Sequence, residues 1–322
     1  MMNGIIFAFR FLFRNKWKII LTVWFALFFF FILFPVNDLN DLITTQISKL
    51  TQKTLFIQFD TLSLNPFGPK ITLEKVFVES GSIPTITVNE LSVLPSLSAL
   101  ISRQPEGVVV AQGFLKGDIQ IQIKAAPKSD GGLPRSKLEV QVKNINLKDL
   151  RELASLPVVI QGKLNLTSTA LADLTLTEQP ELELNLTISK FEMPNSSLVL
   201  SDLGRVSLPE VKLGQIELKG KLAGGKFVIE SGKFGQSSDD LHGDIKGDLG
   251  ITFANRSGQI IPVMGAYNID LNLSATYAFK ERAKFFLNFL DGYKTDSPTG
   301  ANYKFKIRAT AAGMPPQFTR LQ

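Results

Sequence analysis

Residues 212–251 read "KLGQIELKGKLAGGKFVIESGKFGQSSDDLHGDIKGDLGI" and alternate apolar with polar residues almost throughout. A period of two is typical of β-strands, because successive side chains of a strand point to opposite faces of its sheet. Ala223-Gly224-Gly225 separates two such runs and predicts a hairpin turn that needs positive φ angles. The stretch therefore predicts a meander of antiparallel strands.

The large apolar side chains of this stretch share one parity, and we expect them to face inward and to line a groove. These candidate lining residues are Ile216, Leu218, Leu222, Phe227, Ile229, Leu241, Ile245 and Leu249. Gly220, Gly243 and Gly247 fall on the same parity, where glycine marks a bulge, a bend or a close approach of other atoms. In an open groove these glycines would widen the channel.

The composition argues against several kinds of chemistry. The 322 residues include no cysteine and a single histidine, His242, so disulfides and Cys- or His-based metal sites are not expected. The patterns G-x-x-x-x-G-K-[ST], G-x-S-x-G and H-E-x-x-H are missing. We therefore expect no enzyme and no catalytic, cofactor-binding or metal-binding residues, and we interpret His242 as a solvated strand residue.

The formal net charge of +6 comes largely from the N-terminus. Arg10, Arg14, Lys16 and Lys18 are four of the 35 basic residues, which leaves 31 basic against 29 acidic residues in the rest of the chain. Binding of nucleic acid requires a clustered basic face, and no such run occurs. We expect no nucleic-acid partner.

The segment 19–34, "IILTVWFALFFFFILF", contains no charged residue and predicts a single membrane-spanning anchor. A cleaved signal peptide is the alternative, but it would need small residues after the apolar run. The basic residues before the segment place the N-terminus in the cytoplasm by the positive-inside rule, with the body on the other side. The expected anchor residues are Trp17, Ile19, Trp24, Phe28 and Phe34.

Four regions follow from the patterns. Residues 1–36 form the cytoplasmic N-terminus and anchor; residues 37–124 hold an amphipathic helix and a first β region; residues 125–136, "AAPKSDGGLPRS", form a linker; and residues 137–322 form a second β region. The amphipathic helix carries a stripe of Leu39, Leu42, Ile43, Ile47 and Leu50. A late helix is expected near 279–291, with Phe285, Phe286, Phe289 and Leu290 on one side.

We expect a mainly β fold: an N-terminal transmembrane helix followed by an elongated, curled, groove-like antiparallel sheet with a few short helices. Such a long sheet must curl, split or cover its apolar face, since an open apolar face in water promotes aggregation. A groove and a closed β-sandwich both put one parity inward, so periodicity leaves the two open.

Two parts of the chain resemble known families. The anchor, the short helix and the stretches "LFIQFDTLSLNPFGPKITLEKVFV" and "PTITVNELSVLPSLSALISRQ" resemble the start of AsmA-like proteins. The stretch "LPEVKLGQIELKGKLAGGKFVIESGKFGQSSDDLHGDIKGDLGI" and the later "DGYKTDSPTGANYKFKIRATAAGMPPQF" resemble the type II secretion system N proteins (GspN). "ATAAG" departs from the closing-strand pattern of that family.

The resemblance implies a single-pass protein of the bacterial inner membrane with a periplasmic body. Its function would be that of an accessory component of the type II secretion system. The partners of the protein would then be the inner membrane, other secretion subunits and phospholipid. The alternative is an AsmA-like lipid-binding or lipid-transfer protein, in which the inward parity lines a hydrophobic groove.

Overall fold

The computed structural model describes most of the 322 residues. The described residues are 16–33, 39–51, 55–65, 68–80, 83–96, 99, 106–126, 134–173, 176–200, 204–256, 259–311 and 313–321. Part of the short helix that "SLSALISRQP" predicts and the end of the predicted anchor, Phe34, lie outside them.

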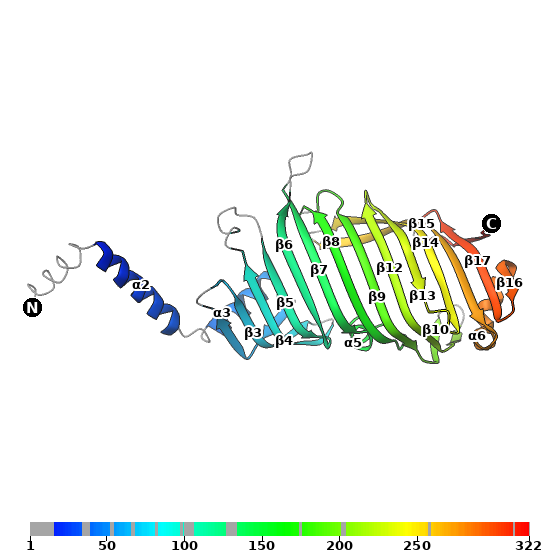
Figure 1. Ribbon diagram of the computed structural model, residues 1–322, viewed down its shortest axis with the longest axis horizontal. Coiled ribbons are helices and arrows are strands. Elements are labelled where there is room, and N and C mark those ends of the chain that lie inside the picture. Colours follow the sequence, from blue (N-terminus) through cyan, green and yellow to red (C-terminus); the bar gives the residue numbers. More distant parts are fainter. Residues whose placement is uncertain are drawn as a thin grey trace, which may run out of the picture.

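One antiparallel sheet of 16 strands makes up the body (Figure 1). Its order along the main path is β1-β3-β4-β5-β6-β7-β8-β9-β12-β13-β14-β15-β17-β16, with β2 paired to β3 and β18 paired to β17. The strands are β1 (Leu55–Gln58), β2 (Thr61–Leu64), β3 (Ile71–Ser80), β4 (Ile83–Pro95), β5 (Gly107–Phe114), β6 (Gly117–Ala126), β7 (Arg135–Asn146), β8 (Gln161–Ala172), β9 (Glu181–Met193), β12 (Val211–Ala223), β13 (Lys226–Phe234), β14 (Leu241–Arg256), β15 (Gln259–Thr276), β16 (Lys294–Ser297), β17 (Gly300–Ala309) and β18 (Gln317–Arg320).

The predicted meander is confirmed in residues 212–251. β12, β13 and β14 are consecutive antiparallel neighbours, and the turn between β12 and β13 has φ of +57° at Gly224 and +76° at Gly225. Positive φ at both central residues is the type I′ geometry, which matches the twist of the flanking strands and favours glycine. A local signal thus decides this hairpin.

The sheet continues through the predicted linker. β6 and β7 pair from Asp118–Lys143 to Ala126–Arg135, and the pairs Ala125–Ser136 and Ala126–Arg135 join the two ends of the segment 125–136. The two predicted β regions therefore belong to one sheet.

Both edges of the long sheet are built in the same way. On one side β1 and β2 share the outer edge of β3, and on the other side β16 and β18 share the outer edge of β17. Each of these four strands has four residues. Very short edge strands reduce edge-to-edge pairing with other molecules, so the two edges are protected against aggregation.

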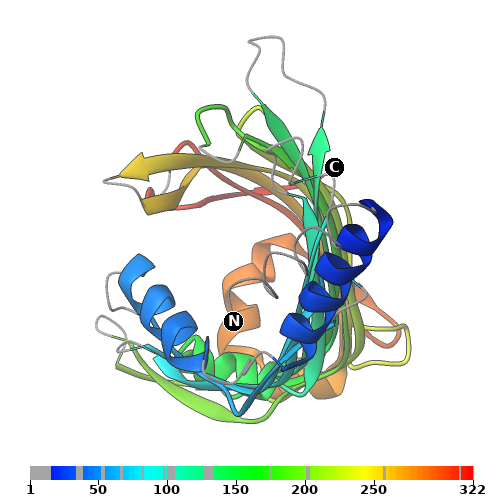
Figure 2. The same ribbon diagram turned by 90° about the vertical axis from the view of Figure 1, so that its left-hand side faces the viewer.

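The sheet is open and is not packed against a second large sheet. Among the described residues the only other sheet is the hairpin of β10 (Ser196–Leu200) and β11 (Gly204–Leu208). Figure 2 shows long strands bending toward the side on which α3 and α6 lie. The described residues therefore form one open sheet, which is neither the β-sandwich that periodicity left open nor a closed channel.

Six helices are described. They are α2 (Lys16–Leu33), α3 (Asn40–Leu50), α5 (Leu147–Leu153), α6 (Tyr277–Arg282), α7 (Lys284–Leu287) and the 3₁₀-helix η2 (Asn288–Tyr293). The predicted amphipathic helix is confirmed as α3. In "NLKDLRELASL" a leucine recurs every three residues from Leu147 to Leu156, which predicts a helix, and α5 confirms it. Asn146 caps α5, because its side chain accepts a hydrogen bond from the backbone N–H of Lys148 at 2.9 Å.

α2 is the helix predicted as an anchor. Trp17 and Trp24 are exposed, Ile19 and Phe28 are partly exposed, and the rings of Trp24 and Phe28 stack with centroids 5.4 Å apart. No helix among the described residues is both long enough and apolar enough to span a membrane. The expectation of a transmembrane helix is thus not supported by the described part of the chain.

The late helix differs from its prediction. It is broken at Ala283 into α6, α7 and η2, and the side chains that it buries are Phe279, Ala283 and Leu287. Two residues of the predicted apolar side, Phe285 and Phe289, are 53% and 73% exposed. Phe286 and Leu290 of the same predicted side are partly buried, and Leu290 packs on the core, so the prediction holds for these two residues and is wrong for Phe285 and Phe289.

Candidate apolar binding face

The strand register aligns apolar side chains in rows across the sheet. One row consists of the successive partners Val142, Leu166, Leu186, Leu218, Gly232, Ile245, Leu271 and Phe305. A second row consists of Ile145, Leu164, Ile188, Ile216, Phe234, Gly243, Leu273 and Tyr303. We call these rows, together with the parallel rows of the same parity, the apolar face.

All eight predicted lining residues belong to the apolar face. Leu218 lies opposite Gly232, which lies opposite Ile245, and Leu222 lies opposite Phe227, which lies opposite Leu249. A Cβ atom on Gly232 would meet the side chains of both Leu218 and Ile245, so the three positions share one face. The predicted parity is therefore confirmed. It continues across one register shift in the β12–β13 pair and one in the β13–β14 pair.

The middle of this face is only half-buried. Of the predicted lining residues, Leu222 and Phe227 are buried, with 3% and 9% exposed. The apolar residues of the neighbouring strands β8 and β9 are also partly exposed; these are Leu164, Leu166, Leu182, Leu184, Leu186 and Ile188. The aliphatic surface of the central strands is therefore shielded mainly by neighbours on the same face.

The two ends of the face are covered. At one end α3 contributes Ile43 to the core around Leu62, Leu73, Val76 and Val88. At the other end Phe279, Ala283 and Leu287 pack on Leu273, Ala301, Tyr303 and Phe305. The two described core clusters therefore lie at opposite ends of the sheet, under α3 and under α6 and α7.

The glycines of the face do not widen it. A Cβ atom on Gly220 would collide with the ring of Phe227, and one on Gly243 would come within 2.6 Å of Cζ of Phe234. The two rings thus lie over the glycines and fill the space of the missing side chains, an arrangement that supports glycine in strands. The expected widening of a channel at Gly220 and Gly243 is therefore wrong.

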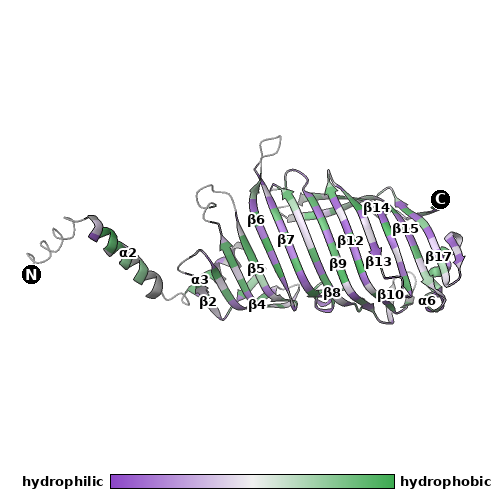
Figure 3. Cartoon of the chain, in the orientation of Figure 1, coloured by the Kyte–Doolittle hydropathy of each residue, from purple (hydrophilic) through white to green (hydrophobic). Residues whose placement is uncertain are grey.

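The opposite face of the sheet is polar. The partners Gln120, Gln141, Thr167, Asn185 and Lys219 form one row across it, and they line a hollow of about 410 Å³. Lys221 lies 3.3 Å from Glu183 and 3.5 Å from Glu230 in the next row. The hydropathy colours alternate along the strands accordingly (Figure 3). One face of the sheet is therefore polar and the other apolar.

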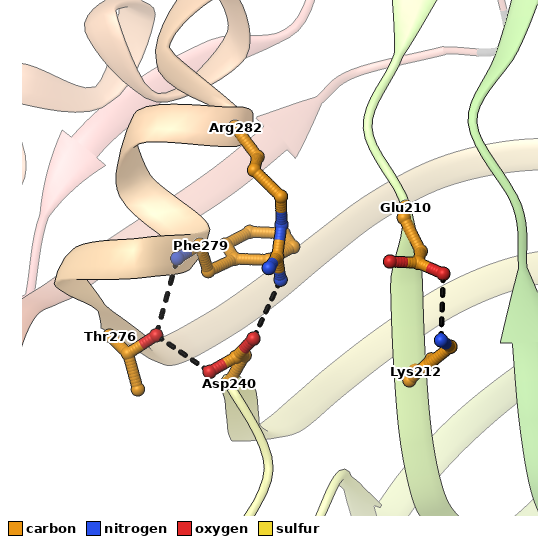
Figure 4. A network of polar contacts seen from close by, with 6 residues as sticks. All are labelled: Glu210, Lys212, Asp240, Thr276, Phe279 and Arg282. Carbon is orange, nitrogen blue, oxygen red and sulfur yellow. Dashed lines mark hydrogen bonds and ion pairs between the residues drawn. The ribbon is translucent and has the colours of Figure 1, made fainter.

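A polar network fixes the helix that covers the C-terminal end of the face (Figure 4). Asp240 accepts hydrogen bonds from Nη2 of Arg282 at 2.6 Å and from the hydroxyl of Thr276 at 3.0 Å. The hydroxyl of Thr276 in turn caps α6 by accepting from the N–H of Phe279 at 3.2 Å. The Arg282 and Thr276 donors lower the pKa of Asp240. The carboxylate therefore joins the β13–β14 turn to α6.

No cluster of three or more potential metal ligands is found in the described part of the chain. His242 lies opposite Ser274 in the sheet. Gln179 in the β8–β9 loop hydrogen-bonds the backbone of Phe253 through its side chain, and the sequence did not predict this contact. No pattern marks such a contact, because the two residues are 74 positions apart.

Comparisons with known proteins found no protein-family model, no curated protein and no solved structure that matches this chain. The resemblance to the secretion and AsmA-like families therefore rests on the quoted stretches alone.

Proposed function

We propose that this protein binds the acyl chains of phospholipids along the apolar face, as a membrane-attached lipid-binding or lipid-transfer protein. The observation that carries the proposal is the half-exposed aliphatic surface of β8, β9, β12 and β14 between two covered ends. Soluble proteins rarely leave a contiguous apolar surface of more than a few hundred Å² open to water. A ligand that covers this surface is thus expected.

The chemistry of the face favours an acyl chain over a polar ligand. The lateral row from Val142 to Phe305 contains only aliphatic, aromatic and glycine residues. Each methylene removed from water contributes about 0.8 kcal/mol, so ten methylenes offer roughly 8 kcal/mol before the costs of association are subtracted. The elongated sheet offers a surface of the same elongated shape as an acyl chain.

α2 supplies the membrane attachment in this proposal. Its exposed residues include Trp17, Leu21, Trp24, Phe25 and Phe29. Aromatic and aliphatic side chains of this kind partition into a bilayer and its interface. We propose the bacterial inner membrane, with the sheet on the periplasmic side, as the expected location.

Photo-crosslinking in cells tests the proposal on the full chain. A benzophenone side chain at Leu186, Leu218 or Ile245 should form adducts with phospholipid that mass spectrometry detects. The same group at Asn185, Lys219 or Lys246, on the opposite face, should form none or few. Equal adduct yields from the two faces, or no lipid adducts at either face, would contradict the proposal.

A second candidate function is that of an accessory component of the type II secretion system. The exposed rings of Phe285 and Phe289, 5.6 Å apart at the C-terminal end of the sheet, favour a contact with a partner protein. If this function holds, secretion subunits should co-purify with the full chain, and Phe285→Asp with Phe289→Asp should abolish the association. Retention of the subunits by that variant would exclude these rings as the contact.

A further inference from the structure

β14 and β15 extend beyond the neighbouring strands as a two-stranded arm, residues 251–256 and 259–264. The pairs Ile251–Met264, Thr252–Val263, Phe253–Pro262 and Ala254–Ile261 hold the arm together. β13 pairs with β14 only as far as Gly250, and β17 pairs with β15 only from Tyr267 onward. Figure 2 shows the arm crossing on the side of the sheet where α3 and α6 lie. The arm is therefore outside the main ladder.

The base of the arm has the features of a hinge. The register between β14 and β15 shifts between Leu249 and Ile251, and Gly250 faces Gly265 at this point. A Cβ atom on Gly250 would lie 3.2 Å from Cα of Gly265, so the two backbones approach closely. A bulge and glycines without side chains leave the backbone here free to change its angle.

A single side chain latches the arm to a distant loop. Oε1 of Gln179 accepts from the N–H of Phe253 at 2.8 Å, and Nε2 of Gln179 donates to the carbonyl oxygen of Phe253 at 3.0 Å. The amide of Gln179 thus replaces a strand partner. In the sheet, β9, β12 and β13 lie between β8 and β14. Measured across the strands, the β8–β9 loop is therefore roughly 14–19 Å from β14, at ~4.8 Å per strand.

The other edge of the arm is blocked. Because both polar groups of Phe253 point away from β15, the Phe253–Pro262 pair is a non-hydrogen-bonded pair, and the nitrogen of Pro262 points to the outer edge. Proline has no N–H to offer a further strand there. Gln179 occupies one edge of the arm, and Pro262 blocks strand pairing at the other. Neither edge can therefore accept a further strand at this position.

We propose that the arm is a strap that hinges at Gly250 and Gly265, is latched by Gln179, and controls the exchange of acyl chains on the apolar face. This inference rests on the proposed function. Both faces of the arm carry apolar residues: Ile251, Phe253, Pro262 and Met264 alternate with Ala254, Ile261 and Val263. Latched, the arm lies beside the ends of β12 and β13, where Ile251 donates to the carbonyl of Gly225 at 2.9 Å. Unlatched, it would swing away from these strand ends on the side of the sheet where α3 and α6 lie.

The test measures how fast a fluorescent diacyl phospholipid leaves the full chain into excess unlabelled vesicles of phosphatidylethanolamine and phosphatidylglycerol. Gln179→Ala should raise the rate at least threefold, and hydrogen exchange of the Phe253 amide should accelerate with it. Gln161→Ala, at the other end of β8, is the matched control and should change neither rate. The chain has no cysteine, so Gln179→Cys with Phe253→Cys, joined by a short thiol cross-linker, should slow lipid release at least tenfold.

The outcomes separate the two proposals. In one outcome the wild type binds lipid while the cross-linked and the uncross-linked double variants release it at the same rate. That result would contradict the strap but not the binding of lipid to the apolar face. Unchanged amide exchange at Phe253 in Gln179→Ala overturns the latch. A wild-type chain that takes up no phospholipid contradicts the proposed function, and the role of the arm in exchange falls with it.

Discussion

Arg282 on α6 lies 2.6 Å from Asp240 in the β13–β14 turn, and this ion pair holds the covering helix on the end of the sheet. Both side chains are partly exposed, so after solvent screening the pair contributes about 0.5–1 kcal/mol. The same carboxylate also accepts from Thr276. The contact connects the stability of the fold to the protonation of one group.

The first prediction follows from the lowered pKa of Asp240, caused first by the hydrogen bond from Arg282. A carboxylate with a lowered folded-state pKa stabilises the fold above its unfolded pKa, about 3.9, and this contribution is lost as the pH falls through the folded value. Asp240→Asn should lower the free energy of unfolding at pH 7 and reduce its dependence on pH below about 4. Denaturant unfolding across pH 2–7 measures this, with Glu281→Gln, an exposed residue on the same helix, as a control that should change little.

A second prediction concerns Gly220. Alanine there would place a methyl group against the ring of Phe227 and 2.8 Å from the carbonyl oxygen of Val228. Overpacking of this kind costs about 1–3 kcal/mol. Gly292→Ala, where no atom lies within 4 Å, should change the free energy of unfolding by less than about 0.5 kcal/mol. Equal effects of the two changes would contradict the packing of the ring on Gly220.

A third prediction compares the two faces. Leu218→Asp and Ile245→Asp place a charge on the apolar face, and we expect a loss of about 1–3 kcal/mol in stability together with loss of phospholipid binding. Lys219→Glu and Lys246→Glu are exposed on the opposite parity and should cost less than about 0.5 kcal/mol. Chemical denaturation paired with a lipid-binding assay measures both effects, and equal sensitivity of the two parities would be incompatible with the strand register.

A fourth prediction is a substitution that should increase the free energy of unfolding. Tyr303 is fully buried, burial raises its pKa, and its hydroxyl has no hydrogen-bond partner among the described residues. A buried hydroxyl without a partner costs about 1–3 kcal/mol, so Tyr303→Phe should stabilise the protein by roughly 1 kcal/mol. Thermal unfolding of this variant beside Tyr277→Phe, an exposed residue, is the measurement; a destabilised Tyr303→Phe would reveal a partner for the hydroxyl.

A fifth prediction concerns α2. Trp24→Asp with Phe28→Asp should release the protein from the membrane fraction, because charges replace two stacked aromatic rings on an exposed apolar helix. Thr22→Ala on the same helix should leave the distribution unchanged. Carbonate extraction and immunoblotting of the fractions give the result, and a double variant that stays with the membrane would show that α2 is not the attachment.

The sequence by itself determined the parity of the strands, the Gly224–Gly225 turn, the helices α3 and α5, and the position of the eight predicted lining residues on the apolar face. These are local properties: side chains alternate along any strand, and a turn type selects its own residues. The single sheet across residues 125–136, the break at Ala283 and the rings over Gly220 and Gly243 were decided only by the tertiary structure. So was the latch of Gln179 on Phe253. Each depends on contacts between residues brought together by strand pairing, and no period in the sequence records which strands become neighbours or where a bulge shifts their register.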